Sequence, residues 1–323
     1  MEYRKIGSSG LRVSPICVGT AFRGLWSGRG DEQTCMAVID RAVEAGLNFF
    51  DCANFYQTGR CEEILGRALQ RRAGLRDQLV ITSKVESSMG EGPNDSGLSR
   101  YHIMREIDRS LQRLLLDHID IYLLHHFSPD TEMAETLRAM DDLVHAGKIR
   151  YYGICNFRPA QVVEALWICD RMGLEQPLVL QNQYNLLHRV EVEPELIPLC
   201  RRFGLGLMTY SAVGVGLLTG QFRKGQKPPT GTLWARQSSR FDEVMTEGVD
   251  RIVQELAAIG AELGKSLAQI AIAWILDQEG VSSAMIGPDL PEQVDEALGA
   301  VGWSLPVAAK QRLDELSEPD LLG

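Results

Sequence analysis

The sequence of 323 residues contains no apolar run of the roughly 18 residues that a membrane-spanning helix requires. Its first residues, MEYRKIG, do not have the charged-then-apolar pattern of a signal peptide. Cysteine is limited to seven residues, an odd number without a CxxC pair, mostly within apolar segments such as SPICVG and LWICD. We therefore expect reduced, buried thiols in a cytoplasmic protein, and, since zinc-type ligand spacing is absent, no metal site.

Basic residues are fewer than acidic residues. The chain has 33 Lys and Arg against 43 Asp and Glu, which gives a formal net charge of −10. This excess of negative charge argues against a nucleic acid or an anionic membrane as a partner. The rest of the composition, 45% hydrophobic and 24% charged, is typical of a globular protein with a large core.

Short apolar runs rich in β-branched residues alternate with longer segments of helical periodicity. Two short runs on either side of a Ser-Ser-Gly turn predict an N-terminal hairpin. The predicted strands that follow are Val13–Gly19, Phe49–Ala53, Leu79–Val85, Ile119–His125, Ile149–Asn156, Leu178–Tyr184, Leu205–Ser211 and Ser282–Gly287. Asp31 and Ser99 are predicted helix N-caps, and Gly46 and Gly173 predicted helix ends.

Eight strands that alternate with helices predict a parallel sheet, because parallel neighbours need a crossover connection. A doubly wound open sheet would be favoured by a GxGxxG motif after the first strand, and Cys17-Val18-Gly19-Thr20 begins no such motif. We therefore predict an α/β protein with a (β/α)8 TIM barrel, an N-terminal β-hairpin and extra helices, in one domain over residues 1–323.

One connection, Gly214 to Arg240, is longer than the others. It carries five glycines, two prolines and several cations, and a long loop at the carboxyl end of a barrel strand is typical of a functional segment. Its cations are Arg223, Lys224, Lys227, Arg236 and Arg240. The next helix, from about Glu243 to Leu263, has no strand before it and is predicted to be an addition to the barrel.

Four polar residues lie at or just beyond the ends of buried strands, where a barrel has its active-site mouth. They are Asp51, Tyr56, Lys84 and His125. Each alone also has a structural interpretation: a strand-end Asp often caps a loop, a Lys there can reach water, and a lone His is often a hydrogen-bonded core residue. Together they predict acid–base chemistry: a neighbouring ammonium favours the phenolate of a tyrosine, a carboxylate keeps that ammonium charged, and the imidazole bonds a substrate oxygen.

The motifs NFFDCANFY with GRCEEILGRAL, IDIYLLHHFSPDT, GKIRYYGICNF, QNQYNLLHR, YSAVGVGLLTG and GPDLPEQVDEAL resemble, in order, those of the aldo-keto reductase superfamily. The resemblance covers about Tyr3 to Trp303 and includes bacterial glyceraldehyde-phosphate and methylglyoxal reductases and potassium-channel β-subunits. It implies carbonyl reduction with a nicotinamide cofactor, NAD(P)(H). It makes Tyr56 the general acid, tuned by Lys84 and Asp51, with His125 orienting the carbonyl of a small-molecule substrate.

The same resemblance implies the remaining site residues. Asn156 and Gln181 would hold the nicotinamide amide, Tyr210 would stack on its ring, and the segment from Ser211 would approach the pyrophosphate. The cofactor-binding set is Gly19, Thr20, Asn156, Gln181, Tyr210, Ser211, Gly216, Leu217, Gly287, Asp289, Gln293 and Glu296. The substrate-pocket set is Phe22, Trp26, Phe55, His126 and Phe127.

Three positions depart from the family pattern. Cys155 stands where many relatives have a serine for the amide, and Ala297 replaces the usual asparagine. Asp289 stands where NADP-using relatives offer Ser, Lys or Arg to the 2′-phosphate, and a carboxylate repels phosphate but accepts hydrogen bonds from a ribose diol. The departure at Asp289 favours NAD(H), whereas the basic segment from Arg223 to Arg240 is the argument for NADP(H).

Two other functions stay open. A cofactor-binding regulatory subunit of the channel β-subunit type would keep the site but turn over little. A metal-dependent barrel hydrolase or isomerase using Asp51, His125 and His126 is disfavoured, because adjacent strand residues point to opposite faces. The physiological substrate, the direction of the reaction and the oligomeric state, including a homo-oligomer, are not determined by the sequence.

Overall fold

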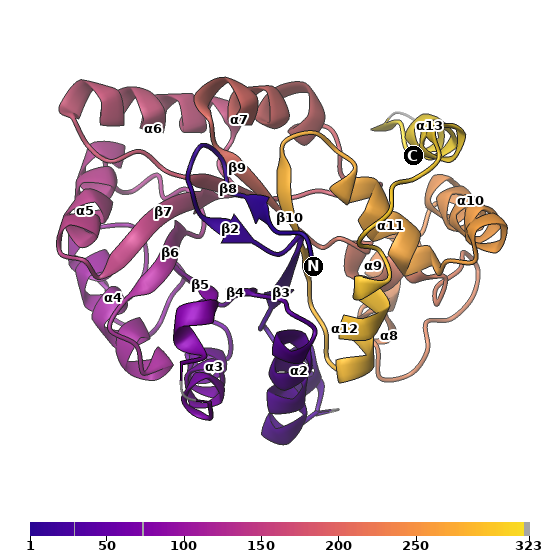
Figure 1. Cartoon of the computed structure of the whole chain (residues 1–323), viewed down its shortest axis with the longest axis horizontal. Coiled ribbons are helices and arrows are strands. Elements are labelled where there is room, and N and C mark those ends of the chain that lie inside the picture. Colours follow the sequence, from indigo (N-terminus) through magenta and orange to yellow (C-terminus); the bar gives the residue numbers. More distant parts are fainter. Residues whose placement is uncertain (29, 73, 320–323) are drawn as a thin grey trace.

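The computed structural model describes residues 1–28, 30–72 and 74–319. Eight parallel strands form a closed barrel in the order β10-β3-β4-β5-β6-β7-β8-β9, which confirms the predicted (β/α)8 architecture. Figure 1 shows these strands at the centre with helices around them. The barrel strands are β3 (Ile16–Gly19), β4 (Phe49–Asp51), β5 (Val80–Val85), β6 (Ile119–Leu124), β7 (Ile149–Cys155), β8 (Val179–Gln183), β9 (Gly206–Tyr210) and β10 (Val281–Ile286).

The predicted N-terminal hairpin is present as β1 (Arg4–Lys5) paired antiparallel with β2 (Arg12–Val13). The prediction of one strand over Val13–Gly19 is wrong, because Ser14 and Pro15 separate β2 from β3. The Ser14 backbone N–H donates to the side chain of Asn48 at 2.7 Å instead of to a strand neighbour. This break separates the hairpin from the first barrel strand.

Helices surround the barrel on all sides in Figure 1. The principal ones are α2 (Glu32–Glu44), α3 (Arg60–Gln70), α4 (Arg100–Leu114), α5 (Met133–His145), α6 (Pro159–Met172), α7 (Ile197–Phe203), α11 (Leu267–Leu276) and α12 (Pro291–Leu298). The side chain of Asp31 accepts from the Thr34 N–H, and that of Ser99 from the His102 N–H, which confirms both predicted N-caps. Gly173 ends α6 with a φ of 65°, as predicted.

The connection after β9 is more ordered than the sequence indicated. The expected long loop contains a 3-10 helix, η3 (Gly214–Thr219), then α8 (Leu233–Arg236) and α9 (Ser238–Val244). The helix expected from about Glu243 begins at Glu247, since Thr246 caps α10 (Glu247–Leu263) and Glu243 belongs to α9. The other elements are α1 (Arg23–Ser27), η1 (Arg76–Gln78), the π-helical turn η2 (Val192–Leu196) and α13 (Val307–Leu316).

The buried side chains form two main clusters. The larger one fills the layer between the strands and the surrounding helices. The smaller one fills the barrel interior and continues into the hairpin through Ile6 and Val13, both fully buried. No single helix in the described ranges is long and apolar enough to cross a membrane; α10 and α11 reach that composition only as a pair bent by 94°.

Three strands are each followed directly by a residue with a positive φ. Glu86 follows β5 with a φ of 140°, Asn156 follows β7 with 59°, and Ser211 follows β9 with 58°. Residues other than glycine rarely adopt this backbone conformation, and such strain is concentrated at functional sites. It also explains why β7 and β9 stop one residue before their predicted ends.

Candidate active site

The four predicted acid–base residues meet at the carboxyl ends of β4, β5 and β6. Asp51 is the last residue of β4, Lys84 lies near the end of β5, His125 directly follows β6, and Tyr56 lies in the loop after β4. The Lys84 ammonium donates to the Asp51 carboxylate, to the Cys52 carbonyl at 2.8 Å and to the Tyr56 hydroxyl at 3.3 Å. The His125 ring lies 6.2 Å from the Tyr56 ring, centroid to centroid.

Two further residues hold Asp51 inside the barrel. The Thr82 hydroxyl donates to Asp51 Oδ1 at 2.5 Å, and the Gln181 amide donates to the same oxygen at 2.9 Å. The sequence analysis did not include Thr82. The sequence did contain a sign of its position, because residues two apart on a strand face the same side and Thr82 is two residues before Lys84. The buried carboxylate is thereby fully hydrogen-bonded, as a buried charge requires.

Burial controls the protonation state of Tyr56. Burial raises its pKa to about 12, and the nearby Lys84 ammonium opposes this shift without cancelling it. The Lys84 ammonium thus acts on the Tyr56 pKa in the expected direction, but burial outweighs it and the net pKa is raised. Burial alone would lower the pKa of Lys84, but Asp51 and Tyr56 outweigh it and raise the pKa above its usual value. The site thus holds a neutral phenol beside a permanent ammonium.

His125 is neutral for a related reason. Burial, then the Lys84 charge and His126, lower its pKa to about 2. Its Nδ1 is buried without a hydrogen-bond partner among the described residues. The Tyr56 hydroxyl accepts from Lys84, so its own proton is available for another acceptor. A neutral imidazole and a phenol can together bind and protonate a carbonyl oxygen.

The predicted substrate-pocket residues are brought together only in part. The Phe55 ring lies 5.0 Å from that of Tyr56 and 5.2 Å from that of His125, and the His126 ring stacks on His125. Phe127 packs against Phe157 instead, at 5.6 Å. Phe22 is buried, whereas Trp26 is 63% exposed.

The stacking of His125 on His126 corrects one step of the sequence argument. Their ring centroids are 4.7 Å apart with planes 8° apart, so the two side chains do not point to opposite faces. Both residues lie beyond Leu124, the last residue of β6, where the alternation of a strand no longer applies. Among the described residues, no group of three or more His, Cys, Asp and Glu side chains is placed to hold a metal ion.

The residues predicted to hold a nicotinamide amide are already partly engaged with one another. Asn156 donates to the His125 carbonyl at 3.0 Å and accepts from the Tyr210 hydroxyl at 2.8 Å. Gln181 donates to Asp51, which leaves its carboxamide oxygen. Cys155 is buried in the barrel interior, and burial raises the pKa of its thiol.

The predicted cofactor residues on β3 and after β9 lie around the same mouth. Gly19 is tightly packed, because a Cβ there would lie 3.1 Å from the Ile286 carbonyl. Thr20 is buried, with its hydroxyl bonded to the Asp51 carbonyl at 3.0 Å. Gly216 has a φ of 89°, and Leu217 is buried against the segment that follows β9.

The residues after β10 form their own hydrogen-bonded unit. Gly287 has open space where a side chain would start. Asp289 Oδ1 accepts from the Gly24 N–H of α1 at 2.7 Å. Gln293 caps α12 by accepting from the Leu290 N–H at 3.1 Å, and it also accepts from the Asp289 N–H at 2.6 Å. Glu296 accepts from the Ser266 hydroxyl. One oxygen of Asp289 is therefore committed to α1.

The cations after β9 are partly neutralised. Arg223 makes two hydrogen bonds to Asp250, at 2.7 and 3.0 Å, and Lys224 pairs with Glu247 at 3.0 Å. Arg236 donates to the Ser27 carbonyl of α1 at 3.1 Å. The segment after β9 thus reaches across to α1, on the side of the barrel where Asp289 also contacts it.

A buried charged network behind the site was not predicted. Glu62 of α3 accepts from Ser83 of β5 at 2.5 Å and from Arg113 of α4 at 2.6 Å. Glu106 of α4 accepts from Asn54, in the loop that carries Tyr56, at 3.2 Å. Both carboxylates are fully buried. Sequence patterns give little sign of this network, because charged residues on a helix are normally read as its exposed face.

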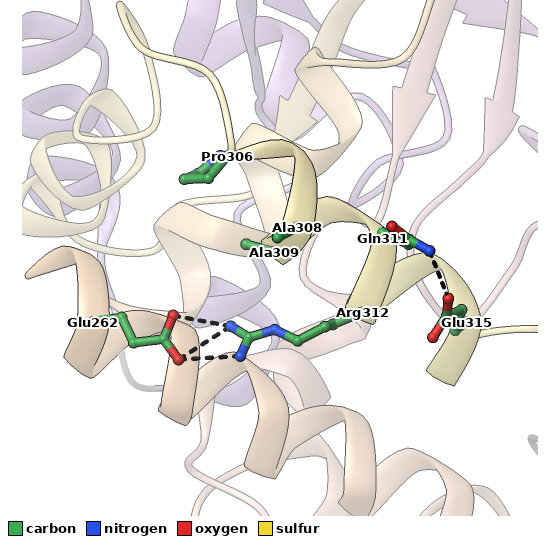
Figure 2. A pocket seen from close by; sticks show the side chains of 7 residues that line it. All are labelled: Glu262, Pro306, Ala308, Ala309, Gln311, Arg312 and Glu315. Atoms are coloured by element: carbon green, nitrogen blue, oxygen red, sulfur yellow. Dashed lines mark hydrogen bonds and ion pairs between the residues drawn. The ribbon is translucent and has the colours of Figure 1, made fainter.

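A separate pocket lies between α10 and α13 (Figure 2). In it, Arg312 of α13 pairs with Glu262 of α10 at 3.0 Å. Gln311 donates to Glu315 at 2.9 Å along the same helix. The lining includes none of the predicted site residues, so this pocket is distinct from the mouth of the barrel.

Comparison with known proteins gives one family over most of the chain. The model of the aldo/keto reductase family matches residues 15–318. A curated relative from Oryza sativa subsp. japonica, described as a probable voltage-gated potassium channel subunit beta, is 35% identical over 317 residues, covering 98% of this chain and 95% of the relative. A relative of the same description from Arabidopsis thaliana is 35% identical over 319 residues, covering 98% and 96%.

Proposed function

The chain belongs to the aldo/keto reductase family, and on this premise we propose that it is an NAD(P)-dependent oxidoreductase that interconverts a small aldehyde or ketone and its alcohol. The observation that carries the proposal is the buried Lys84 ammonium, which bonds both the Asp51 carboxylate and the Tyr56 hydroxyl. We also take residues 1–323 to act as one domain.

In the proposed reaction, Tyr56 donates its proton to the substrate oxygen. The developing phenolate is stabilised by the Lys84 ammonium, which Asp51 keeps charged and oriented. Neutral His125 donates a hydrogen bond to the same substrate oxygen and so selects its position. Hydride exchange at the carbonyl carbon is the chemistry that the nicotinamide supplies when bound.

The polar atoms left free at strand ends fit a nicotinamide cofactor. Asn156 keeps one amide N–H and Gln181 its carboxamide oxygen, a donor and an acceptor that suit a carboxamide. The strained backbone of Asn156 and Ser211 supports a binding role for both residues.

We propose that NAD(H) serves this site at least as well as NADP(H). The Asp289 carboxylate would repel a 2′-phosphate, whereas its second oxygen can accept from a ribose hydroxyl. Two of the cations that could offset this repulsion, Arg223 and Lys224, are already paired with carboxylates.

A cytoplasmic location remains part of the proposal. All seven cysteines are buried free thiols, which supports a reducing compartment.

A second candidate function is a cofactor-binding regulatory subunit. It is favoured by the description of the two relatives as probable potassium channel β-subunits. The two functions share the fold and the site, so the rate of turnover separates them.

The test is a titration of the wild-type protein and of Tyr56→Phe with NADH and NADPH, followed by tryptophan fluorescence, together with steady-state reduction of small aldehydes. We expect both proteins to bind a dinucleotide equally well and the variant to lose about 10²- to 10⁴-fold in kcat, because general acid catalysis contributes that much. Tyr101→Phe, on the exposed surface of α4, is the matched control.

Three outcomes contradict parts of the proposal. Binding without turnover faster than that of Tyr56→Phe would favour the regulatory subunit. Absence of binding to either dinucleotide would exclude the reductase function. A clear preference for NADPH would overturn the assignment based on Asp289.

A further inference from the structure

The turn that carries Tyr56 has a strained backbone. Tyr56 is followed by Gln57 and Thr58, with φ of 49° and 54°, and then by Gly59, with a φ of 92°. A non-glycine backbone of this kind persists only where the surrounding structure imposes it. The position of the Tyr56 hydroxyl therefore depends on the contacts that fix the two ends of this turn.

Asn54 fixes the beginning of the turn. Its backbone N–H donates to the Lys84 carbonyl at 3.3 Å, and its side chain donates to Glu106 Oε2 of α4 at 3.2 Å. The side chains of Asn54 and Glu106 are fully buried. Asn54 thereby joins the turn to the strand that carries Lys84 and to a helix outside the barrel.

Arg113 of α4 packs on the end of the turn. A Cβ on Gly59 would lie 2.5 Å from Arg113 Cδ, so the arginine side chain lies directly against the backbone there. The Arg113 guanidinium bonds Glu62 at 2.6 Å and lies 3.7 Å from Glu106 Oε2. Glu62 also accepts from Ser83 of β5. This network thus contacts both ends of the turn and the strand of the active-site lysine.

We propose that Glu106, acting through Asn54, holds the Tyr56 hydroxyl where it bonds the ammonium and the substrate oxygen. Both are positioning residues, and neither belongs to the acid–base group. This inference rests on the proposed function. The hydroxyl lies at the far end of its side chain, so a small rotation of the turn displaces it more than the backbone itself moves. A displacement of about 1 Å can lower a rate by about 10²-fold.

Stability alone does not account for this network. Buried carboxylates and guanidinium groups lose their hydration, and well-packed apolar side chains of similar volume often stabilise a protein as well or better. Asn54 also keeps its carboxamide oxygen buried without a hydrogen-bond partner among the described residues, which costs free energy. A hydrogen bond has a directional geometry that apolar packing lacks, and a hydroxyl that must be placed accurately requires this property.

The test measures kcat for aldehyde reduction and the Kd for NADH and NADPH in Asn54→Ala, Glu106→Leu and Glu106→Gln. We expect Asn54→Ala and Glu106→Leu to lose about 10- to 100-fold in kcat with an unchanged Kd, because only the position of Tyr56 changes. Glu106→Gln keeps an oxygen that can accept from Asn54, so it should retain most of the wild-type kcat.

Two substitutions on the same helix are controls. Arg109→Gln removes the half-exposed partner of the other Glu106 oxygen, bonded at 2.9 Å, and leaves the bond to Asn54 in place. Ile107→Val thins the buried core of α4 and tests whether a loss of stability by itself lowers kcat. Both should reduce aldehydes at the wild-type kcat. Urea unfolding measures the stability of every variant, and Asn54→Ala decides the question if Glu106→Leu does not fold.

The outcomes separate this inference from the proposed function. A wild-type kcat in Asn54→Ala would overturn the positioning role and leave the reductase function intact. An equal loss in Glu106→Gln and Glu106→Leu, or a similar loss in Ile107→Val, would also overturn it, because charge or stability would then set the rate. If the wild type reduces no aldehyde, the proposed function fails, and the positioning role with it.

Discussion

The Tyr56 hydroxyl lies within hydrogen-bonding distance of a buried ammonium and yet remains protonated near neutral pH. The reason is a balance of magnitudes, since removing the phenolate from water costs more than one ammonium at 3.3 Å returns. The Lys84 charge is in turn retained only because Asp51 compensates it within the same buried space. The state of each residue is therefore a property of the three together.

This balance predicts an asymmetric dependence of the rate on pH. With the pKa of Tyr56 raised to about 12, the acid form persists, so kcat/KM for aldehyde reduction should stay level from about pH 6 to about pH 10. Alcohol oxidation needs the phenolate and should rise about ten-fold per pH unit over the alkaline part of that range. Initial rates in both directions with constant cofactor measure this.

His125 contributes no step to either profile, because its pKa of about 2 keeps the imidazole neutral throughout. A fall in the reductive rate centred near neutral pH would contradict the assignment of Tyr56 as a strongly buried acid. A parallel rise of both directions with pH would also be inconsistent with it.

At the scale of the elements, α3 and α4 are joined to β5 by buried charges. Arg113 of α4 bonds Glu62 of α3, which also accepts from Ser83 of β5. Gly66 of α3 packs so closely on the end of α4 that a Cβ would lie 2.7 Å from its backbone. The close approach of the helices and the buried ion pair keep this side of the barrel in one arrangement.

Replacing Arg113 by methionine should destabilise the protein by about 3 to 5 kcal/mol, because it leaves the buried Glu62 carboxylate without a charged partner. Arg67→Met on α3, which breaks an exposed pair with Glu32 of α2, should cost about 1 kcal/mol or less. Urea unfolding of the two variants measures the difference. Equal costs would show that water reaches Glu62 and that the network is not a buried one.

At the scale of the whole molecule, the barrel separates a stabilising end from a reactive end. The acid–base residues lie at the carboxyl ends of the strands, whereas the hairpin packs at their amino ends. Gly206, the first residue of β9, lies so close to Ile6 that a Cβ would be 2.7 Å from its side chain. In Figure 1 the hairpin lies across the barrel beside the N-terminus.

We expect Ile6→Ala to destabilise the protein by about 2 to 5 kcal/mol, because it opens a cavity in a fully buried cluster. Its kcat should equal that of the wild type, since the reacting groups lie at the opposite end. Ile6→Val, with a smaller cavity, should cost about 0.5 to 1.5 kcal/mol. Denaturant unfolding and steady-state kinetics measure both quantities, and a loss of kcat in step with stability would contradict the separation of the two ends.

The sequence by itself determined the class of fold and the polar residues that meet in the site. Apolar runs at strand length alternate with helical periods, and this local pattern depends only on which side chains are buried. It located all eight barrel strands to within a few residues, apart from joining β2 to β3 across Ser14 and Pro15. Asp51, Tyr56, Lys84 and His125 were predictable because polar groups at the ends of apolar strands are unusual.

Only the tertiary structure decided how those residues are paired and charged. The bonds from Gln181 to Asp51, from Gly24 to Asp289 and from His126 to Glu86 join segments that are far apart in the chain. The direction of the Tyr56 pKa depends on burial by several elements at once. Neither kind of information is recorded in local periodicity, because closure of the barrel brings these groups together and removes the water around them.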